Sequence, residues 1–189
     1  MNGKPVAAGK SSFDLLDAER FFNELGPIKG SVLLDAACGA GNYTLAAAGR
    51  MGGSGLIHAV DLWREGIESL DAQIARRKIA NIRTHVADIT KKIPLDDDAV
   101  DICLMATVLH DLVEEKTHEG SLREIKRVIR PGGLFAVVEF NKTGGRPGPP
   151  VHVKLSPEEL DAVVAPFGFQ IVKTAQIGDD NYMSVFCKP

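Results

Sequence analysis

The chain has 189 residues, a formal net charge of −3 and an isoelectric point near 6.0, and 44% of its residues are hydrophobic. This length and apolar content fit one domain with a sizeable core, so we expect a single domain over residues 1–189 with residues 1–12 flexible. The weak negative charge argues against nucleic acid or an anionic membrane as the main partner.

The composition also bears on compartment. Residues 1–12 lack the apolar segment of a signal peptide, and no apolar run reaches the ~18 residues of a membrane span. The three cysteines, Cys38, Cys103 and Cys187, have no metal-ligand spacing. Reduced thiols are the simplest interpretation, so we expect a cytoplasmic protein without a metal site. The sequence leaves the oligomeric state open.

The first predicted element is a helix over residues 13–25, closed by the stop signal Gly26-Pro27. The stretch that follows, residues 32–43, reads VLLDAACGAGNY: an apolar strand ending in an acid, a turn of small residues and a helix start. Such a unit brings the backbone and a helix N-terminus close to a nucleotide. The same pattern also occurs in α/β proteins that bind no nucleotide there, so the later elements carry the argument.

This stretch departs from the dinucleotide pattern G-x-G-x-x-G, because Ala37 and Asn42 stand where its outer glycines belong. A pyrophosphate cradle is therefore disfavoured. With Asp35 at the strand end and Cys38-Gly39-Ala40-Gly41 after it, the stretch resembles the first motif of class I S-adenosylmethionine-dependent methyltransferases, D-x-G-C-G-x-G. Ala37 replaces the first glycine of that motif. The resemblance implies S-adenosyl-L-methionine as cofactor.

Strands and helices alternate along the rest of the chain. Further strands are predicted over residues 56–61, 83–88, 100–106, 134–140, 169–174 and 182–187, and further helices over residues 43–49, 65–78, 121–129 and 157–165. The alternation predicts an α/β fold with a doubly wound, seven-stranded, mainly parallel sheet. The last two strands have only a short turn between them, which demands an antiparallel pair. That ending resembles the class I methyltransferase fold and not a six-stranded dinucleotide enzyme.

Ligands of open α/β sheets bind beyond the carboxyl ends of the strands, where the first three predicted strands end in Asp35, Asp61 and Asp88. Asp61 is predicted to accept from the ribose hydroxyls and Asp88 from the adenine amino group. Asp35 is predicted to lie where the cationic methionine part passes. The resemblance implies the same roles. The alternative is that such acids cap the following helix.

Apolar side chains next to these acids are predicted to sandwich the adenine. We favour Leu62 and Ile89, and we leave Trp63 open between this role and covering the sheet edge. The complete set predicted to contact the cofactor is Phe13, Asp35, Ala37, Cys38, Gly39, Gly41, Asp61, Leu62, Asp88, Ile89, Met105 and Ala106.

The end of the fourth strand supplies the candidate for catalysis. His110 is predicted to accept a proton where the transferred methyl points, because an imidazole pKa near ~6.5 suits a base at neutral pH. Alternatively, His110 packs or contacts a carboxylate. A metal site built from His110, His152 and Glu139 is conceivable but lacks diagnostic spacing.

Residues 122–140 resemble the helix, P-G-G turn and fifth strand of methyltransferases that include the ubiquinone and menaquinone C-methyltransferases. The predicted function is methyl transfer to a small molecule by in-line displacement, aligned by the enzyme. Two alternatives are a non-catalytic adenosyl-binding or partner-binding module and a nicotinamide-dependent reductase. Phe13 and residues 144–150 are predicted to form a mobile cover.

Overall fold

The computed structural model describes Gly9, residues 11–144 and residues 147–189. A single sheet runs through this part in the order β3-β2-β1-β4-β5-β7-β6. Strands β1 to β5 run parallel to one another, and β7 lies antiparallel between β5 and β6. The predicted fold class is therefore confirmed. No described helix is long and apolar enough to cross a membrane.

Helices and strands alternate up to β3, and the connection from β3 to β4 contains no helix in this described stretch. The strands are β1 (Val32–Ala36), β2 (Leu56–Asp61), β3 (Ile82–Val86), β4 (Val100–Ala106), β5 (Ile129–Phe140), β6 (Gln170–Gln176) and β7 (Asn181–Cys187). The helices are η1 (Phe13–Leu15), α1 (Ala18–Leu25), α2 (Asn42–Met51), α3 (Arg64–Arg77), α4 (Leu109–Glu114), α5 (His118–Val128), α6 (Pro157–Val164) and η2 (Ala165–Phe167).

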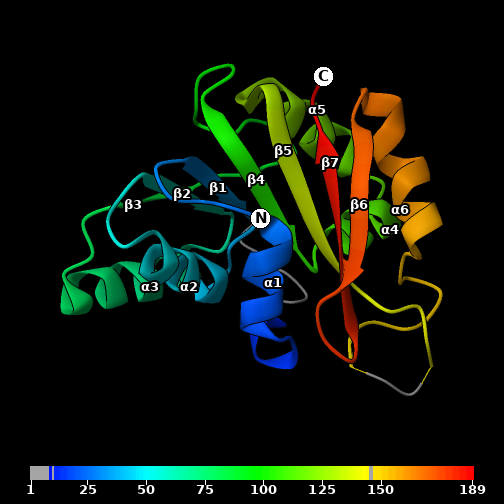
Figure 1. Cartoon of the computed structure of the whole chain (residues 1–189), viewed down its shortest axis with the longest axis horizontal. Helices are drawn as coiled ribbons and strands as arrows, with labels where there is room; N and C mark the ends of the chain where they lie inside the picture. Colours follow the sequence, from blue (N-terminus) through cyan, green and yellow to red (C-terminus); the bar gives the residue numbers. More distant parts are fainter. Residues whose placement is uncertain (1–8, 10, 145–146) are drawn as a thin grey trace.

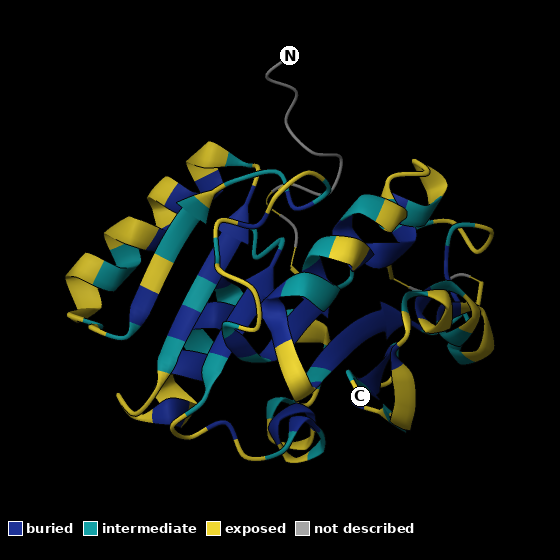
Figure 2. Cartoon of the chain, turned by 90° about the horizontal axis from the view of Figure 1, so that it is seen from above, coloured by how far each residue is buried: buried dark blue, intermediate teal, exposed yellow. Residues whose placement is uncertain are grey.

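Helices cover both faces of the sheet (Figure 1). Successive strand residues point to opposite faces, so Leu33 packs with α1, α2 and α3 while Leu34 packs with α4, α5 and α6. Figure 2 shows buried residues concentrated in the middle strands and exposed residues on the outer sides of the helices. The sheet therefore lies between two apolar cores, one on each face.

The start of α6 is a capping box, as the sequence predicts. The Ser156 side chain accepts from the Glu159 N–H at 3.3 Å, and the Glu159 carboxylate accepts from the Ser156 N–H at 2.8 Å. Pro157 occupies the first helical turn, where its missing N–H costs nothing. The predicted helix over 157–165 is thus present, with η2 continuing from Ala165.

Several elements differ from the predictions, and β5 begins at Ile129, before the predicted strand over residues 134–140. The helix expected over residues 13–25 is divided into η1 and α1, because Leu16 is extended and the Asp17 side chain caps α1 by accepting from the Arg20 N–H. Strand β3 ends at Val86, so Asp88 lies two residues beyond it. Helix α4 was not predicted; it has six residues and no side-chain cap from its own N-cap residue.

Candidate cofactor site and its neighbourhood

The turn between β1 and α2 has an unusual backbone. Ala37, Gly39 and Gly41 have φ values of 62°, 57° and 82°, in the left-handed region that favours glycine. Ala37 therefore holds a conformation better suited to the glycine of the family motif. A Cβ on Gly41 would lie 2.5 Å from Leu70 of α3, whereas one on Gly39 would meet nothing within 4 Å. The turn is packed tightly on one side and open at Gly39.

Asp61, the last residue of β2, ties this turn to the start of α3. Its two carboxylate oxygens accept one hydrogen bond each, from the Gly39 N–H and the Trp63 N–H, both at 2.7 Å. Each oxygen keeps a further lone pair for a ligand. Burial raises the pKa of Asp61, and the backbone hydrogen bonds oppose that rise. The neighbouring Leu62 leaves 55% of its surface exposed, an apolar face beside a hydrogen-bond acceptor.

Asp35 lies one layer deeper, inside β1. The hydroxyl of Thr44 in α2 donates to its carboxylate. The pKa of Asp35 is raised to about 7, mainly by burial and also by the negative charge of Asp61, while the hydrogen bonds from Thr44 oppose the rise. Asp35 therefore joins β1 to α2 beneath the turn, and its predicted place beside the methionine part stays a prediction.

Asp88 and Ile89 are engaged close to their own backbone. Asp88 accepts from the N–H and hydroxyl of Thr90 at 3.0 and 2.6 Å and pairs with Lys91 at 3.1 Å. Burial acts to raise the pKa of Asp88, but these contacts outweigh it and hold the pKa below its usual range. Ile89 is buried in the core under α4 and α5. The adenine contacts assigned to both residues stay predictions.

The remaining predicted cofactor residues surround the turn at different depths. Cys38 is half-buried, and burial raises the pKa of its thiol. Met105 is fully buried in the core, and Ala106 packs partly buried on the opposite face of the sheet. Phe13 lies edge-on to the ring of Tyr43, with 5.0 Å between ring centroids. The cofactor contacts assigned to these four residues stay predictions.

His110, in the first turn of α4, is only 3% exposed. Its Nδ1 lies 2.6 Å from one oxygen of Glu139, whose other oxygen accepts from the His110 backbone N–H at 3.1 Å. Nε2 is 3.5 Å from the Asp111 carboxylate. Burial acts to lower the pKa of His110, but Glu139 and Asp111 outweigh it and raise the pKa. The two carboxylates thus favour the protonated form of the ring, and a proton-accepting role for His110 stays a prediction.

His152 of the conceivable metal set is exposed. Within the described ranges, no group of three or more His, Cys, Asp and Glu side chains is arranged to hold a metal ion.

A chain of three hydroxyls was not predicted. Ser12 is buried, and its hydroxyl lies 2.8 Å from the Tyr43 hydroxyl and 3.0 Å from the Thr107 hydroxyl. A Cβ on Gly9 would lie 3.6 Å from the Trp63 ring. Gly9 therefore lies beside Trp63, just after β2, and Ser12 lies beside Thr107, just after β4. No sequence signal marks these contacts, which join residues 31 and 95 positions apart.

Trp63 itself packs against the start of α3: a Cβ on Gly66 would lie 2.3 Å from its ring. Its position thus favours covering the sheet edge over free contact with a ligand.

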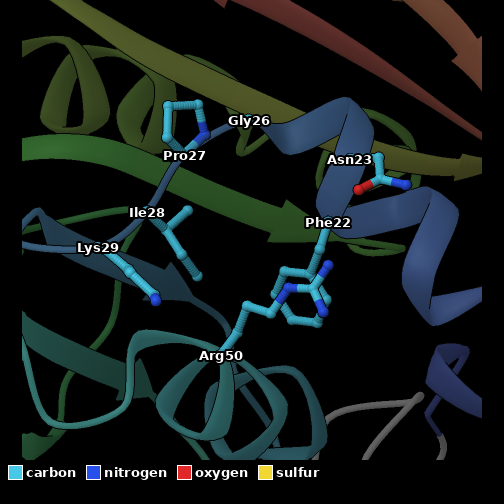
Figure 3. A pocket seen from close by; sticks show the side chains of 7 residues that line it. All are labelled: Phe22, Asn23, Gly26, Pro27, Ile28, Lys29 and Arg50. Atoms are coloured by element: carbon cyan, nitrogen blue, oxygen red, sulfur yellow. The ribbon is translucent and has the colours of Figure 1, made fainter.

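A separate shallow pocket of about 550 Å³ lies where α1 ends and β1 begins (Figure 3). Arg50 reaches into it from α2, over the Phe22 ring at 5.4 Å, and pairs with Glu19 at 2.9 Å. Its other lining residues are Asn23, Gly26, Pro27, Ile28 and Lys29. These residues precede β1, at the opposite edge of the sheet from the Gly39 turn, and none is in the predicted cofactor set.

The seven-stranded sheet with its antiparallel last strand, and the acid and glycine turn at the carboxyl ends of β1 and β2, define a class I S-adenosylmethionine-dependent methyltransferase fold. The model of the methyltransferase domain family matches residues 34–137, more than half of the chain. The chain belongs to this family.

Relatives within the family carry quinone-methyltransferase names. The chain is 32% identical over 126 residues to the ubiquinone/menaquinone biosynthesis C-methyltransferase UbiE of Azotobacter vinelandii, covering 66% of this chain and 48% of that protein. It is 31% identical over 117 residues to a 2-phytyl-1,4-naphtoquinone methyltransferase of Nostoc punctiforme, covering 60% and 48%. The chain spans about half the length of the curated relatives it matches.

Among solved structures, a SAM-dependent methyltransferase from Aquifex aeolicus superposes with a TM-score of 0.85 at 26% identity. The superposition covers 95% of this chain and 93% of that one. The likeness thus extends through the terminal strands, beyond the segment that the family model matches.

Proposed function

We propose that this protein transfers a methyl group from S-adenosyl-L-methionine to a nucleophilic atom of a small molecule, releasing S-adenosylhomocysteine. The observation that carries the proposal is the Asp61 carboxylate, fixed by two backbone N–H groups beside the open Gly39 turn and the exposed Leu62. These residues fit an adenosyl group: acceptors for a ribose diol, an apolar face for adenine, and space where a side chain would otherwise stand.

The bound cofactor supplies an electrophilic methyl carbon on a sulfonium. The chain's own residues then bind, orient and exclude water. Asp61 orients the ribose, Leu62 covers the adenine, and Ser12, hydrogen-bonded to Thr107, limits access of water at the carboxyl end of β4. Alignment of the acceptor atom with the methyl group is the main contribution, and such pre-organisation is worth up to ~7–11 kcal/mol in favourable systems.

The small-molecule class of acceptor is supported by the quinone-methyltransferase names of the relatives. A cytoplasmic location is part of the same proposal. It is supported by the three cysteines, which are all free thiols and thus suit a reducing compartment.

A labelling experiment distinguishes the transferase from two alternatives, a non-catalytic adenosyl-binding module and a nicotinamide-dependent reductase. Purified protein is incubated with methyl-labelled S-adenosylmethionine and a metabolite panel that includes reduced quinones, and the label is followed by mass spectrometry. Label in a product supports the transferase. Cofactor binding without transfer to any panel member favours a non-catalytic module, and binding of NADH in place of S-adenosylhomocysteine favours a reductase.

A further inference from the structure

A buried lysine at the carboxyl end of β5 has no role in the site described so far. Lys154, two residues before the N-cap of α6, is only 2% exposed. A buried ammonium is costly unless it is paired and fully hydrogen-bonded, so lysines are rarely buried without a carboxylate partner. Within the described residues, no carboxylate lies within salt-bridge distance of Lys154, which sets it apart from the paired lysines of this chain.

The compensation that Lys154 receives is partial. Its ammonium donates to the Thr143 carbonyl at 3.1 Å and lies 5.7 Å from the centre of the Phe140 ring. An ammonium has three N–H donors, and the described residues account for one of them. The aromatic face adds a cation–π contact but accepts no hydrogen bond of ordinary strength.

The nearby carboxylates are already committed. Glu139 binds the ring and the backbone N–H of His110, and Asp111 lies at 3.5 Å on the other side of that ring. Lys154 is close enough for its charge to act on His110, against the effect of the two acids. Among these four residues, the positive charge of Lys154 is therefore the one without a paired carboxylate.

A polar atom without a hydrogen-bond partner among the described residues lies in the same corner as Lys154. Asn181 stands opposite Phe140 in the ladder of β5 and β7, is fully buried, and donates to the Glu139 carbonyl at 3.3 Å. Its Oδ1 accepts no hydrogen bond from the described residues. A spare donor and a spare acceptor thus flank the end of β5.

This corner lies where we expect the methyl acceptor to bind. The proposed adenosyl site occupies the carboxyl ends of β1 and β2. The carboxyl ends of β4 and β5 lie along the same edge of the sheet and remain available to the methyl acceptor. Phe140 connects the two parts of the corner: it lies edge-on to His110 at 6.1 Å, and the backbone of Gly148 packs so closely that an added Cβ would lie 2.6 Å from the ring.

We propose that Lys154 is a specificity-determining residue that receives an anionic oxygen of the methyl acceptor, either a carboxylate or an ionised hydroxyl. This inference rests on the proposed methyl transfer and narrows its substrate class to small molecules that carry such an oxygen. The ammonium gains the charge-assisted hydrogen bonds that the described residues leave unmade. Lys154 positions the acceptor and takes no part in bond making.

The test uses full-length protein saturated with S-adenosylhomocysteine and two probes of the same shape, benzoate and its neutral analogue benzamide, in calorimetric titrations. We expect benzoate to bind at least about tenfold more tightly than benzamide. A third probe, 4-nitrophenolate, distinguishes an ionised hydroxyl from a carboxylate. Lys154→Met should abolish the preference for the anion. Lys173→Met, which removes a surface lysine paired with Glu24, should retain it.

A stability measurement separates this role from a structural one. Removing an under-compensated buried charge should leave the melting temperature of Lys154→Met unchanged or raised. A lower melting temperature together with an unchanged preference for benzoate would make Lys154 structural and overturn the inference. If the methionine variant does not fold, Lys154→Gln, which can still donate to Thr143, serves instead. It too must lose the preference.

The outcomes also separate the two proposals. If wild-type protein fails to bind S-adenosylhomocysteine, the proposed function falls and the assignment of Lys154 falls with it. If S-adenosylhomocysteine binds but neither benzoate nor 4-nitrophenolate is preferred over benzamide, only the assignment of Lys154 is overturned.

Discussion

The carboxyl edge of the sheet has two ends that are built in different ways. At the ends of β1 and β2, the site is formed mainly by the backbone: left-handed turn residues and N–H groups surround Asp61. At the ends of β4 and β5, side chains from distant parts of the chain form a buried charged group of His110, Glu139 and Lys154. The first end is where we propose that the cofactor binds, and the second is where we propose that the methyl acceptor binds.

We therefore expect substitutions at the two ends to affect different properties of the protein. At the β1–β2 end, a change to the exposed Leu62 should affect cofactor affinity with little cost in stability, whereas a change to Asp35, buried beneath the turn, should affect stability. Changes at the β4–β5 end should affect stability or substrate preference, because its charges are buried and mutually dependent.

The largest effect is expected for Glu139→Ala, which leaves the His110 ring buried without its partner. We predict a loss of about 3–5 kcal/mol in the free energy of unfolding at pH 6, measured by urea denaturation. Glu119→Ala, which breaks the exposed pair with Arg123, is the control and should cost at most about 0.5 kcal/mol. Equal losses in the two variants would contradict a buried ion pair.

The pH dependence of that loss has a definite sign. The folded-state pKa of His110 is raised above its unfolded value, so the stabilisation is fully present below about pH 6.5 and is lost as the pH rises through the folded pKa. The cost of Glu139→Ala should therefore be smaller at pH 9 than at pH 6. A cost that does not change with pH would mean that the pair is not charged.

The second-largest effect is expected for Asp35→Asn, which should stabilise the protein. The folded pKa of Asp35 is raised by burial to about 7, from 3.8, so wild-type stability falls as the pH rises between these values. Asparagine can still accept from the Thr44 hydroxyl and does not ionise. We predict a gain on the order of 2–4 kcal/mol at pH 8 and almost none at pH 4. Equal gains at both pH values would rule out this cause.

The smallest effect is expected for Leu62→Ala at the β1–β2 end. Its exposed side chain should contribute about 1 kcal/mol to S-adenosylhomocysteine binding by covering apolar surface, and almost nothing to stability. The control is Val172→Ala on the edge strand β6, where the side chain is 58% exposed. Val172→Ala should alter neither quantity. A loss of stability in Leu62→Ala without a change in affinity would remove Leu62 from the proposed site.

The two ends also differ in how much the sequence reveals. The turn from Asp35 to Gly41 and the acid at Asp61 are local patterns, so the fold class and the cofactor class could be predicted. The contacts of Ser12 with Thr107 and of His110 with Glu139 join positions 95 and 29 residues apart, and no local pattern encodes them. Helix α4 was missed for the same reason, since its first turn is held by Glu139.

The account's central claim is that Asp61 anchors an adenosyl cofactor at the ends of β1 and β2. Calorimetric titration of S-adenosylhomocysteine and NADH into wild-type protein and Asp61→Ala tests it most directly, with Asp71→Ala of α3 as a control that loses only a surface bond to Thr84. We predict one site for S-adenosylhomocysteine, weakened by ~1.5–3 kcal/mol in Asp61→Ala alone, and no binding of NADH. Binding of NADH, or unchanged affinity for S-adenosylhomocysteine in Asp61→Ala, would contradict the claim.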